Sequence, residues 1–283
     1  MTVRQIIPIS IITILLIVLY NSVASELLHD WQNNPDYSHG YFIPFIAGYM
    51  AWSRRKGLKN AIWKPNNWGI VIFLLGIIQL ILGVIGAEHF LQSTSLIIVM
   101  LGITLFLGGF KVTRILLVPI LFLLFMIPLP AIIWNDFAFS LRLFASKIAV
   151  NSMHLIGMPV LREGNIIFLP GASLEVVDAC SGIRSLISLL AMSALFAFVV
   201  NQRIWKKWVL FMAAVPIAIA SNIIRLIVTV ALTQVYGKKA AIGVTHTYSG
   251  IATFFFGLLL LLLVSKLLSI NDRSIASDPS CSK

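Results

Sequence analysis

The stretch ILLVPILFLLFMIPLP, residues 115–130, decides the fold class of this chain. It contains no charged or polar side chain. In a lipid bilayer every backbone N–H and C=O must find a partner within the protein, so only α-helices and closed β-barrels span membranes. Barrel strands alternate apolar and polar residues, and this run does not alternate. The stretch therefore predicts a membrane-spanning helix.

The rest of the chain has the same character. Of its 283 residues, 59% are hydrophobic and 11% are charged, and the mean hydropathy is +0.97. A soluble domain carries about 25% charged residues. Because apolar runs of roughly 20 residues recur, we predict an all-α polytopic membrane protein with about eight transmembrane helices. The predicted spans are 6–24, 41–53, 69–86, 91–109, 115–134, 182–200, 208–235 and 247–268.

The Lys and Arg residues set the predicted orientation. Placing the amino terminus in the cytoplasm puts the basic segments 54–64, 111–114 and 203–207 in cytoplasmic loops, as the positive-inside rule requires. The carboxy terminus is then cytoplasmic as well. The net charge of +11 follows from this topology and from anionic lipid at the cytoplasmic leaflet, so it requires no nucleic-acid partner.

This topology places residues 135–180 outside the cytoplasm. Polar residues interrupt 137–157, which predicts an amphipathic helix lying in the membrane interface. The run VLREGNIIFL, residues 160–169, predicts a short β-hairpin before the sixth span, because apolar segments flank a Glu-Gly-Asn turn. We expect one membrane domain over residues 1–270, followed by a disordered cytoplasmic tail at 271–283.

The sixth predicted span opens with VVDACSGIRSLISLL (176–190), which contains a thiol and a fixed positive charge. Cys180 and Arg184 are four residues apart, which is one turn of a helix. Either Asp178 or Ser181 is available as the helix cap. A helix amino terminus and a nearby cation both lower the pKa of a thiol, so Cys180 is a candidate nucleophile.

The last two predicted spans contain further polar side chains. Ionisable residues are costly inside membranes and usually mark a functional interior. An arginine stabilises a thiolate or an oxyanion, and a histidine exchanges a proton with a thiol. These residue types together favour acyl transfer. The polar stripes are Asn222, Arg225, Thr229 and Thr233 on the seventh span, and His246, Ser249 or Gly250, and Thr253 on the eighth.

Each of these residues also has a plainer interpretation. A lone membrane cysteine is more often a packing residue than a nucleophile. His246 has the position of an interfacial residue, and Arg184 that of a residue facing lipid headgroups. Cys180 and His246 are too few ligands for a zinc site, so we expect no metal and no other cofactor.

Four segments of the sequence resemble the exosortase/archaeosortase family, and they occur in the family's order. The segments are NPDYSHGYFIPFIAGYMAW (34–52), DACSGIR (178–184), SNIIRL (221–226) and THTYSG (245–250). The archaeal branch has arginine at the position of His246, so the histidine points to the bacterial exosortase branch.

The resemblance implies a membrane-embedded cysteine transpeptidase of the bacterial inner membrane, with its active site on the extracytoplasmic side. Its substrates would be secreted proteins that end in a PEP-CTERM-like sorting signal: a short motif, a transmembrane helix and a basic tail. Cleavage would transfer these proteins to an acceptor amine on a lipid or envelope molecule. By position, Cys180, Arg225 and His246 match the catalytic residues. The supporting candidates are Arg184, Asn222, Ser181 and His39.

Two other functions compete with this interpretation. The first is a membrane transporter or lipid flippase, in which Arg225 and a seventh span broken at Pro216 line a pathway. The second is an intramembrane protease, which uses the same attack but passes the acyl group to water.

Overall fold

The computed structural model describes residues 12, 14–170, 172–176, 182–200, 202–237 and 244–276, without the side chains of 172, 235–236, 244–247 and 270–276. Its contacts divide the chain into two compact units, Met1–Pro130 and Ala131–Lys283, and each is described here by itself. The prediction of a single domain over residues 1–270 stays a prediction. Among the described residues, four helices are long and apolar enough to cross a membrane. They are Trp68–Ile85, His89–Met126, Ile204–Gln234 and Tyr248–Ser269.

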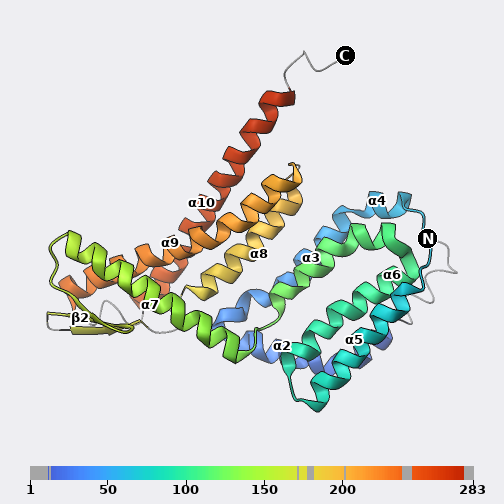
Figure 1. Ribbon diagram of the computed structural model, residues 1–283, viewed down its shortest axis with the longest axis horizontal. Coiled ribbons are helices and arrows are strands. Elements are labelled where there is room, and N and C mark those ends of the chain that lie inside the picture. Colours follow the sequence, from blue (N-terminus) through green and yellow to red (C-terminus); the bar gives the residue numbers. More distant parts are fainter. Residues whose placement is uncertain are drawn as a thin grey trace. The chain divides into compact units, whose positions relative to one another are not determined.

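Two of the predicted spans, 91–109 and 115–134, share one helix, α6 (His89–Phe122). The helix bends at Gly109, where φ is 72° and ψ is −177°, and the chain changes direction there (Figure 1). The backbone carbonyl of Lys64 occupies the place that a β-carbon at residue 109 would need, so the bend requires glycine. The break predicted between these two spans is therefore present, as a bend at Gly109 rather than as a loop, and the second segment ends at Phe122 rather than at residue 134.

Two other predicted spans form helices shorter than the roughly 20 residues that a crossing needs. These are α3 (Ile43–Ser53, 11 residues) and α8 (Ile183–Val199, 17 residues). Residues 6–11 and 13 of the predicted first span, 6–24, lie outside the described residues, and 14–19 and 21–24 are helical. The part of the chain that the structure describes therefore contains four candidate spans, where the sequence predicted eight along the whole chain.

The first unit is entirely helical in its described residues. Its elements are α2 (Asn21–Asn33), η1 (Pro35–Tyr41), α3, α4 (Arg55–Asn60), α5 (Trp68–Ile85), α6 and η2 (Leu123–Met126). Glycines at every seventh residue of α5 let it approach α6 closely. A β-carbon on Gly76 would lie 2.6 Å from Val99 Cγ2, and one on Gly83 would lie 2.9 Å from the backbone nitrogen of Gln92. Such spacing of small residues gives close helix contact in membranes.

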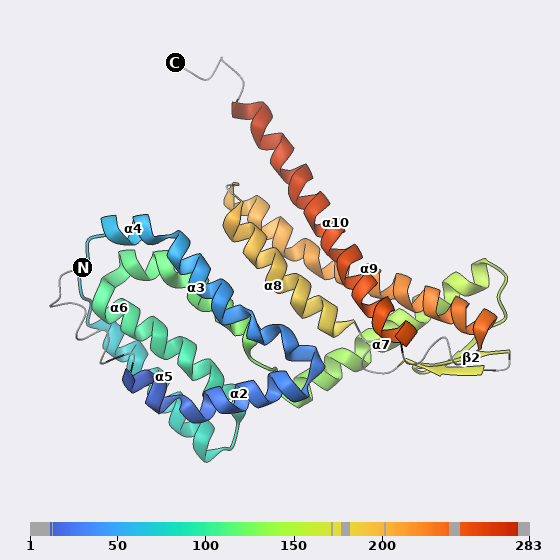
Figure 2. The same ribbon diagram turned by 180° about the vertical axis from the view of Figure 1, so that it is seen from behind.

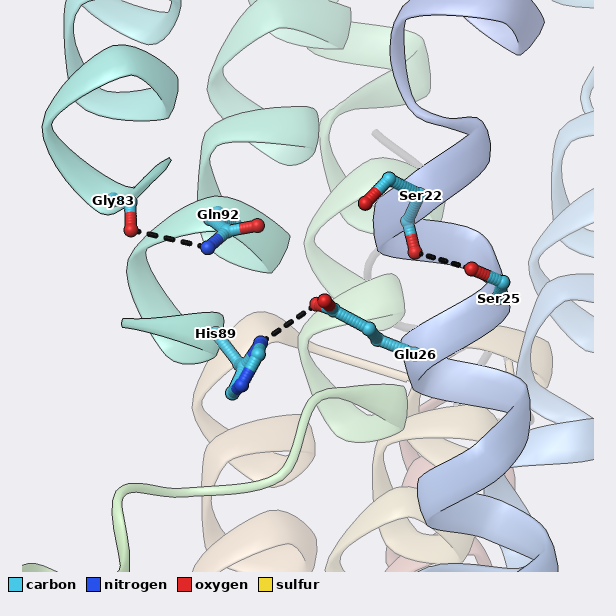
Figure 3. A network of polar contacts seen from close by, with 6 residues as sticks. All are labelled: Ser22, Ser25, Glu26, Gly83, His89 and Gln92. Atoms are coloured by element: carbon cyan, nitrogen blue, oxygen red, sulfur yellow. Dashed lines mark hydrogen bonds and ion pairs between the residues drawn. The ribbon is translucent and has the colours of Figure 1, made fainter. Parts of the chain in front are cut away.

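Polar contacts hold the end of the first unit where α5 passes into α6 (Figure 3). Gln92 Nε2 donates to the carbonyl of Gly83 across 3.0 Å, which ties the start of α6 to the end of α5. His89 Nδ1 lies 2.6 Å from Glu26 Oε2, which joins α6 to α2. The contact of Gln92 with Gly83 is buried, whereas that of His89 with Glu26 is exposed.

The second unit is built around one long helix. Its elements are α7 (Ala131–Leu155), β1 (Leu161–Glu163), β2 (Ile166–Leu169), β3 (Ala172–Glu175), α8, α9 (Ile204–Tyr236) and α10 (Val244–Ala276). Helix α9 contacts α8 and α10 along its first part and α7 and β3 along its second part (Figures 1 and 2). The three strands form an antiparallel sheet in the order β1-β2-β3.

Two hydrophobic clusters follow this change of partners along α9. Leu210, Ala214 and Ala218 pack with side chains of α8 and α10. Leu226 and Val230 pack with α7 and the sheet. The residues between Ala218 and Leu226 therefore lie where α9 passes from one set of neighbours to the other.

The segment predicted to contain an interfacial helix and a hairpin contains a helix and paired strands, with different bounds. That this helix lies in the membrane interface stays a prediction. Helix α7 begins at Ala131 rather than at residue 137, directly after Pro128 and Pro130. Proline disfavours the helical conformation in the residue before it, so these two residues end the preceding helical segment. Strands β1 and β2 pair antiparallel, with Glu163 opposite Ile166. The third strand, β3, was not predicted.

Candidate active site

Helix α8 begins at a contact between two of the motif segments, DACSGIR and SNIIRL. Its cap residue, Gly182, has left-handed backbone angles, with φ at 80°. A β-carbon on Gly182 would lie 2.6 Å from Cγ of Asn222, whose side chain is only 3% exposed. The amide of Asn222 on α9 is thus packed against the backbone at the start of α8. Both the backbone angle and the close approach require glycine at residue 182.

A second contact joins α9 to α10. A β-carbon on Gly250 would lie 3.5 Å from Nη1 of Arg225, so the guanidinium group lies against the backbone of α10. The Thr229 hydroxyl donates to the carbonyl of Arg225 across 2.8 Å, and the Thr233 hydroxyl donates to that of Thr229 across 2.8 Å. The predicted polar stripe of α9 therefore faces the interior of the unit, with Asn222, Thr229 and Thr233 buried.

The polar stripe begins at the junction between the two hydrophobic clusters. Ser221 is also buried there, and its hydroxyl has no hydrogen-bond partner among the described residues. A cavity of about 10 Å³ lies beside Asn222, which is close to the smallest space that holds one water molecule. Its lining comes from α7, the start of α8 and α9: Leu141, Ala145, Gly182, Leu186, Ile219 and Asn222.

Several predicted site residues fall outside what the structure describes. Cys180 and Ser181 are among these residues, and of His246 only the backbone, in the first turn of α10, is described. In sequence, Cys180 is two residues before Gly182. Residue 246 precedes Gly250 by four residues, or about 6 Å along a helix.

Helix α8 begins at Ile183, after the left-handed Gly182. Cys180 lies outside the described residues, so its predicted alignment with Arg184 on one helix face stays a prediction. Arg184 itself is exposed on the first turn of α8.

His39, the remaining supporting candidate, has a structural partner in the first unit. Its Nε2–H donates to the carbonyl of Phe125 across 3.1 Å. Burial lowers the pKa of His39 from its ordinary value of 6.5, because the charged imidazolium loses its hydration. The hydrogen bond to Phe125 opposes part of this effect.

Two neighbours of His39 bind the same stretch of backbone. Trp31 Nε1 donates to the carbonyl of Met126 across 2.9 Å, and the Tyr37 hydroxyl accepts from the N–H of Leu129 across 3.0 Å. Burial raises the pKa of Tyr37 to about 12, so this hydroxyl stays protonated. The segment 34–52 therefore holds the chain where α6 and η2 end, a role that its sequence did not predict.

The described residues contain no group of three His, Cys, Asp or Glu side chains placed to hold a metal ion. The groups that the structure brings together are an amide, a guanidinium, hydroxyls and two glycine backbones. This set can position a loop and stabilise a negative charge, which suits transfer of an acyl group.

Sequence reasoning missed the importance of Gly182. The available signal was a glycine within DACSGIR, directly before an apolar helical run, because glycine adopts left-handed angles without steric cost. Gly250 was one of two alternatives on its helix face, and the structure places its backbone against Arg225.

The segments that make these contacts lie within a match to a known family. The family model of transmembrane exosortases matches residues 31–263. The chain belongs to the transmembrane exosortase family. The match contains both contact pairs, Gly182–Asn222 and Arg225–Gly250, and it confirms the family that the sequence predicted. No curated protein and no solved structure matches the chain.

Membership of the exosortase family agrees with the helical, multi-pass membrane character of the structure. It indicates an exosortase-type function, that of a transpeptidase or protease whose substrates are secreted proteins carrying sorting signals.

Proposed function

We propose that the chain is a cysteine transpeptidase that cleaves a carboxy-terminal sorting signal and transfers the secreted protein to an acceptor amine. The observation that carries this proposal is the pair of contacts through α9, Gly182–Asn222 and Arg225–Gly250. Cys180 is two residues from the first contact along the chain. His246 is about one helical turn from the second. Three residue types suited to acyl transfer thus belong to segments that meet at α9.

In the proposed reaction, the thiolate of Cys180 attacks the carbonyl carbon of a peptide bond in the signal. The carbon–nitrogen bond then breaks, a thioester forms on Cys180, and His246 gives its proton to the departing amine. An acceptor amine attacks the thioester and loses a proton to His246. The thiolate leaves, and the enzyme returns to its starting state.

Arg225 supplies the fixed positive charge of this mechanism. Its guanidinium group stays ionised even where water is scarce, so it stabilises the thiolate or the oxyanion of the tetrahedral intermediate. Asn222 is a positioning residue that supports the backbone before α8. Arg184 and Ser181 are supporting residues near the thiol, with Arg184 suited to an acidic side chain of the signal.

The proposed substrate signal consists of a short motif such as Pro-Glu-Pro, a transmembrane helix and a basic tail. The basic tail stays in the cytoplasm by the positive-inside rule, so the motif is held at the outer face of the bacterial inner membrane. With the enzyme's two termini in the cytoplasm, Cys180 lies at the same face. Docking within the bilayer therefore supplies much of the positioning that the reaction needs.

The test is co-expression of the full chain with a protein that ends in such a signal. We expect Cys180→Ala to abolish processing and to leave the uncleaved substrate in the membrane. Cys281→Ala removes the only other thiol of the chain and should process at the wild-type rate. Normal processing by Cys180→Ala would contradict the proposal and favour a transporter.

Mass spectrometry of the processed carboxy terminus separates the two enzymatic functions. An amine adduct at the new terminus identifies transfer. A free carboxylate on every product identifies an intramembrane protease and rules out transpeptidation.

A further inference from the structure

The charges of the first unit are segregated between its two ends. All seven described Lys and Arg residues of the unit lie at one end, termed the basic end: Arg54, Arg55, Lys56, Lys59, Lys64, Lys111 and Arg114. The four described acidic residues, Glu26, Asp30, Asp36 and Glu88, lie on α2, on η1 and in the loop between α5 and α6. Helix α5 separates the two groups by 18 residues, or about 27 Å.

Three segments of the chain meet at the basic end. Helix α4 contacts α6, and a β-carbon on Gly57 would lie 3.7 Å from Ile115 Cδ1 (Figure 1). After α4, the backbone nitrogen of Lys64 donates to the carbonyl of Gly108 across 3.4 Å. This docks the loop on the bend of α6, which brings Lys64 next to the turn that carries Lys111.

The basic end is open to its surroundings. Helix α4 has no buried residue, and all seven cationic side chains of the basic end are exposed. Within the first unit, the acidic residues are farther away than the Debye length of about 8 Å at physiological ionic strength. The positive potential of the basic end is therefore not cancelled by the unit's own carboxylates.

Exposed tryptophans border the basic end. Trp52 is 58% exposed and Trp68 is 67% exposed, and these residues flank α4 and its loop. The Arg55 guanidinium lies 3.8 Å from the ring centroid of Trp52. Tryptophan is enriched at the level of lipid headgroups, where its ring meets both apolar chains and polar groups.

We propose that the basic end binds the phosphate groups of anionic phospholipids in one leaflet of the membrane. Charge complementarity selects anionic over zwitterionic lipid, and the bordering tryptophans set the depth at which α4 lies. Three lysines surround the lipid headgroup: Lys59 from α4, Lys64 from the docked loop and Lys111 from α6. This assignment does not depend on the chemistry of Cys180.

The test is lipid binding to the purified full-length chain in a neutral detergent, followed by native mass spectrometry. We expect phosphatidylglycerol to bind at least about tenfold more tightly than phosphatidylcholine at low salt, with the preference reduced at high salt by screening. Equal binding of the two lipids by the wild-type chain would overturn the proposal.

A matched pair of triple variants locates the site. The variant Lys59→Gln/Lys64→Gln/Lys111→Gln should lose most of the preference for phosphatidylglycerol. The control Lys147→Gln/Arg203→Gln/Lys266→Gln removes the same charge at exposed positions elsewhere and should keep the preference. Equal losses in the two variants would show a general charge effect and overturn the proposal. Circular dichroism checks that both variants fold.

Two further binding measurements distinguish the lipid from other anions. Inorganic phosphate at millimolar concentration should not displace phosphatidylglycerol, and a short poly-glutamate peptide should bind more weakly than the lipid. Displacement by phosphate would identify a soluble-anion site instead. Tighter binding of the peptide would identify an acidic protein as the partner.

Discussion

The amide of Asn222 lies against the α-carbon of Gly182, with 2.6 Å between Cγ and the place of a β-carbon on the glycine. This contact joins the middle of α9 to the start of α8. Because Asn222 is 3% exposed, neighbouring side chains hold it in place and it cannot move aside freely. Gly182 is therefore a fixed point of the chain, two residues after the candidate nucleophile Cys180.

Substituting Gly182 should disturb the site without removing any candidate catalytic group. We expect Gly182→Ala to cost about 1–3 kcal/mol through overpacking against Asn222, in addition to the left-handed backbone strain. Processing of the substrate should fall at least about tenfold, because small displacements of reacting groups have large effects on rate. Substrate processing in membranes and thermal unfolding in detergent measure the two effects.

Gly157→Ala is the matched control for this substitution. Gly157 also has a left-handed backbone, with φ at 77°, but a β-carbon there meets no atom within 4 Å. The variant Gly157→Ala should lose stability through backbone strain alone and should process substrate normally. If processing decreases equally in both variants, the contact with Asn222 is not the cause of the decrease.

Side chains of increasing size at Gly250 test whether processing depends on the position of the Arg225 guanidinium. Gly250→Ala places a β-carbon 3.5 Å from Nη1, which is ordinary contact, and should be tolerated. Gly250→Leu should displace the guanidinium and reduce processing at least about tenfold, as should Arg225→Lys, because lysine lacks the planar fork. Processing rates at matched protein levels measure the series. Full activity of Arg225→Lys would argue against a role in stabilising charge.

The sequence predicted the class of fold and the polar stripe of α9 because both depend on local pattern. Long apolar runs demand helices in lipid, and residues three or four apart share a helix face. A break between two spans was predicted directly after residue 109, but not that Gly109 alone makes it, since a single residue with φ at 72° leaves no mark on a hydropathy average. The start of α8 was placed correctly to within a residue. The left-handed angle of Gly182 depends on its contact with Asn222, a tertiary contact that spacing alone does not reveal.

The role of the segment 34–52 also depends on long-range contacts. Its His39 and Tyr37 bind backbone groups more than 80 residues away in sequence, at Phe125 and Leu129. Trp31, just before the segment, binds Met126. Periodicity within the segment carries no information about such partners, which is why His39 was predicted to support the active site.

Substituting Gly40 tests whether this segment holds the end of α6. Its α-carbon lies against the indole of Trp31, so the side chain of Gly40→Ala must displace the ring and weaken the bond from Trp31 Nε1 to Met126. We expect a loss of about 1–3 kcal/mol in stability. Gly48→Ala, where a β-carbon meets nothing within 4 Å, should change stability by less than about 1 kcal/mol. Denaturant unfolding in detergent micelles measures both variants, and equal stabilities would contradict the packing argument.

His39 should make the stability of the chain depend on pH. Its pKa in the folded state is lowered by burial, so the unfolded chain takes up a proton near pH 6.5 more readily than the folded chain does. The unfolded state then binds more protons, and stability falls as pH decreases below 6.5 towards the lower folded pKa. Above that pH the contribution of His39 is fully present. Thermal unfolding of the full chain at pH 7.5 and pH 5.5 measures the difference.

The variant His39→Gln separates this titration from the hydrogen bond. Glutamine keeps an N–H donor for the carbonyl of Phe125 but takes up no proton, so the decrease in stability between the two pH values should be smaller than in the wild type. His29→Gln is the matched control, because His29 is an exposed histidine of the same unit, and it should leave the pH dependence unchanged. A decrease in His39→Gln as large as in the wild type would mean that another group is responsible.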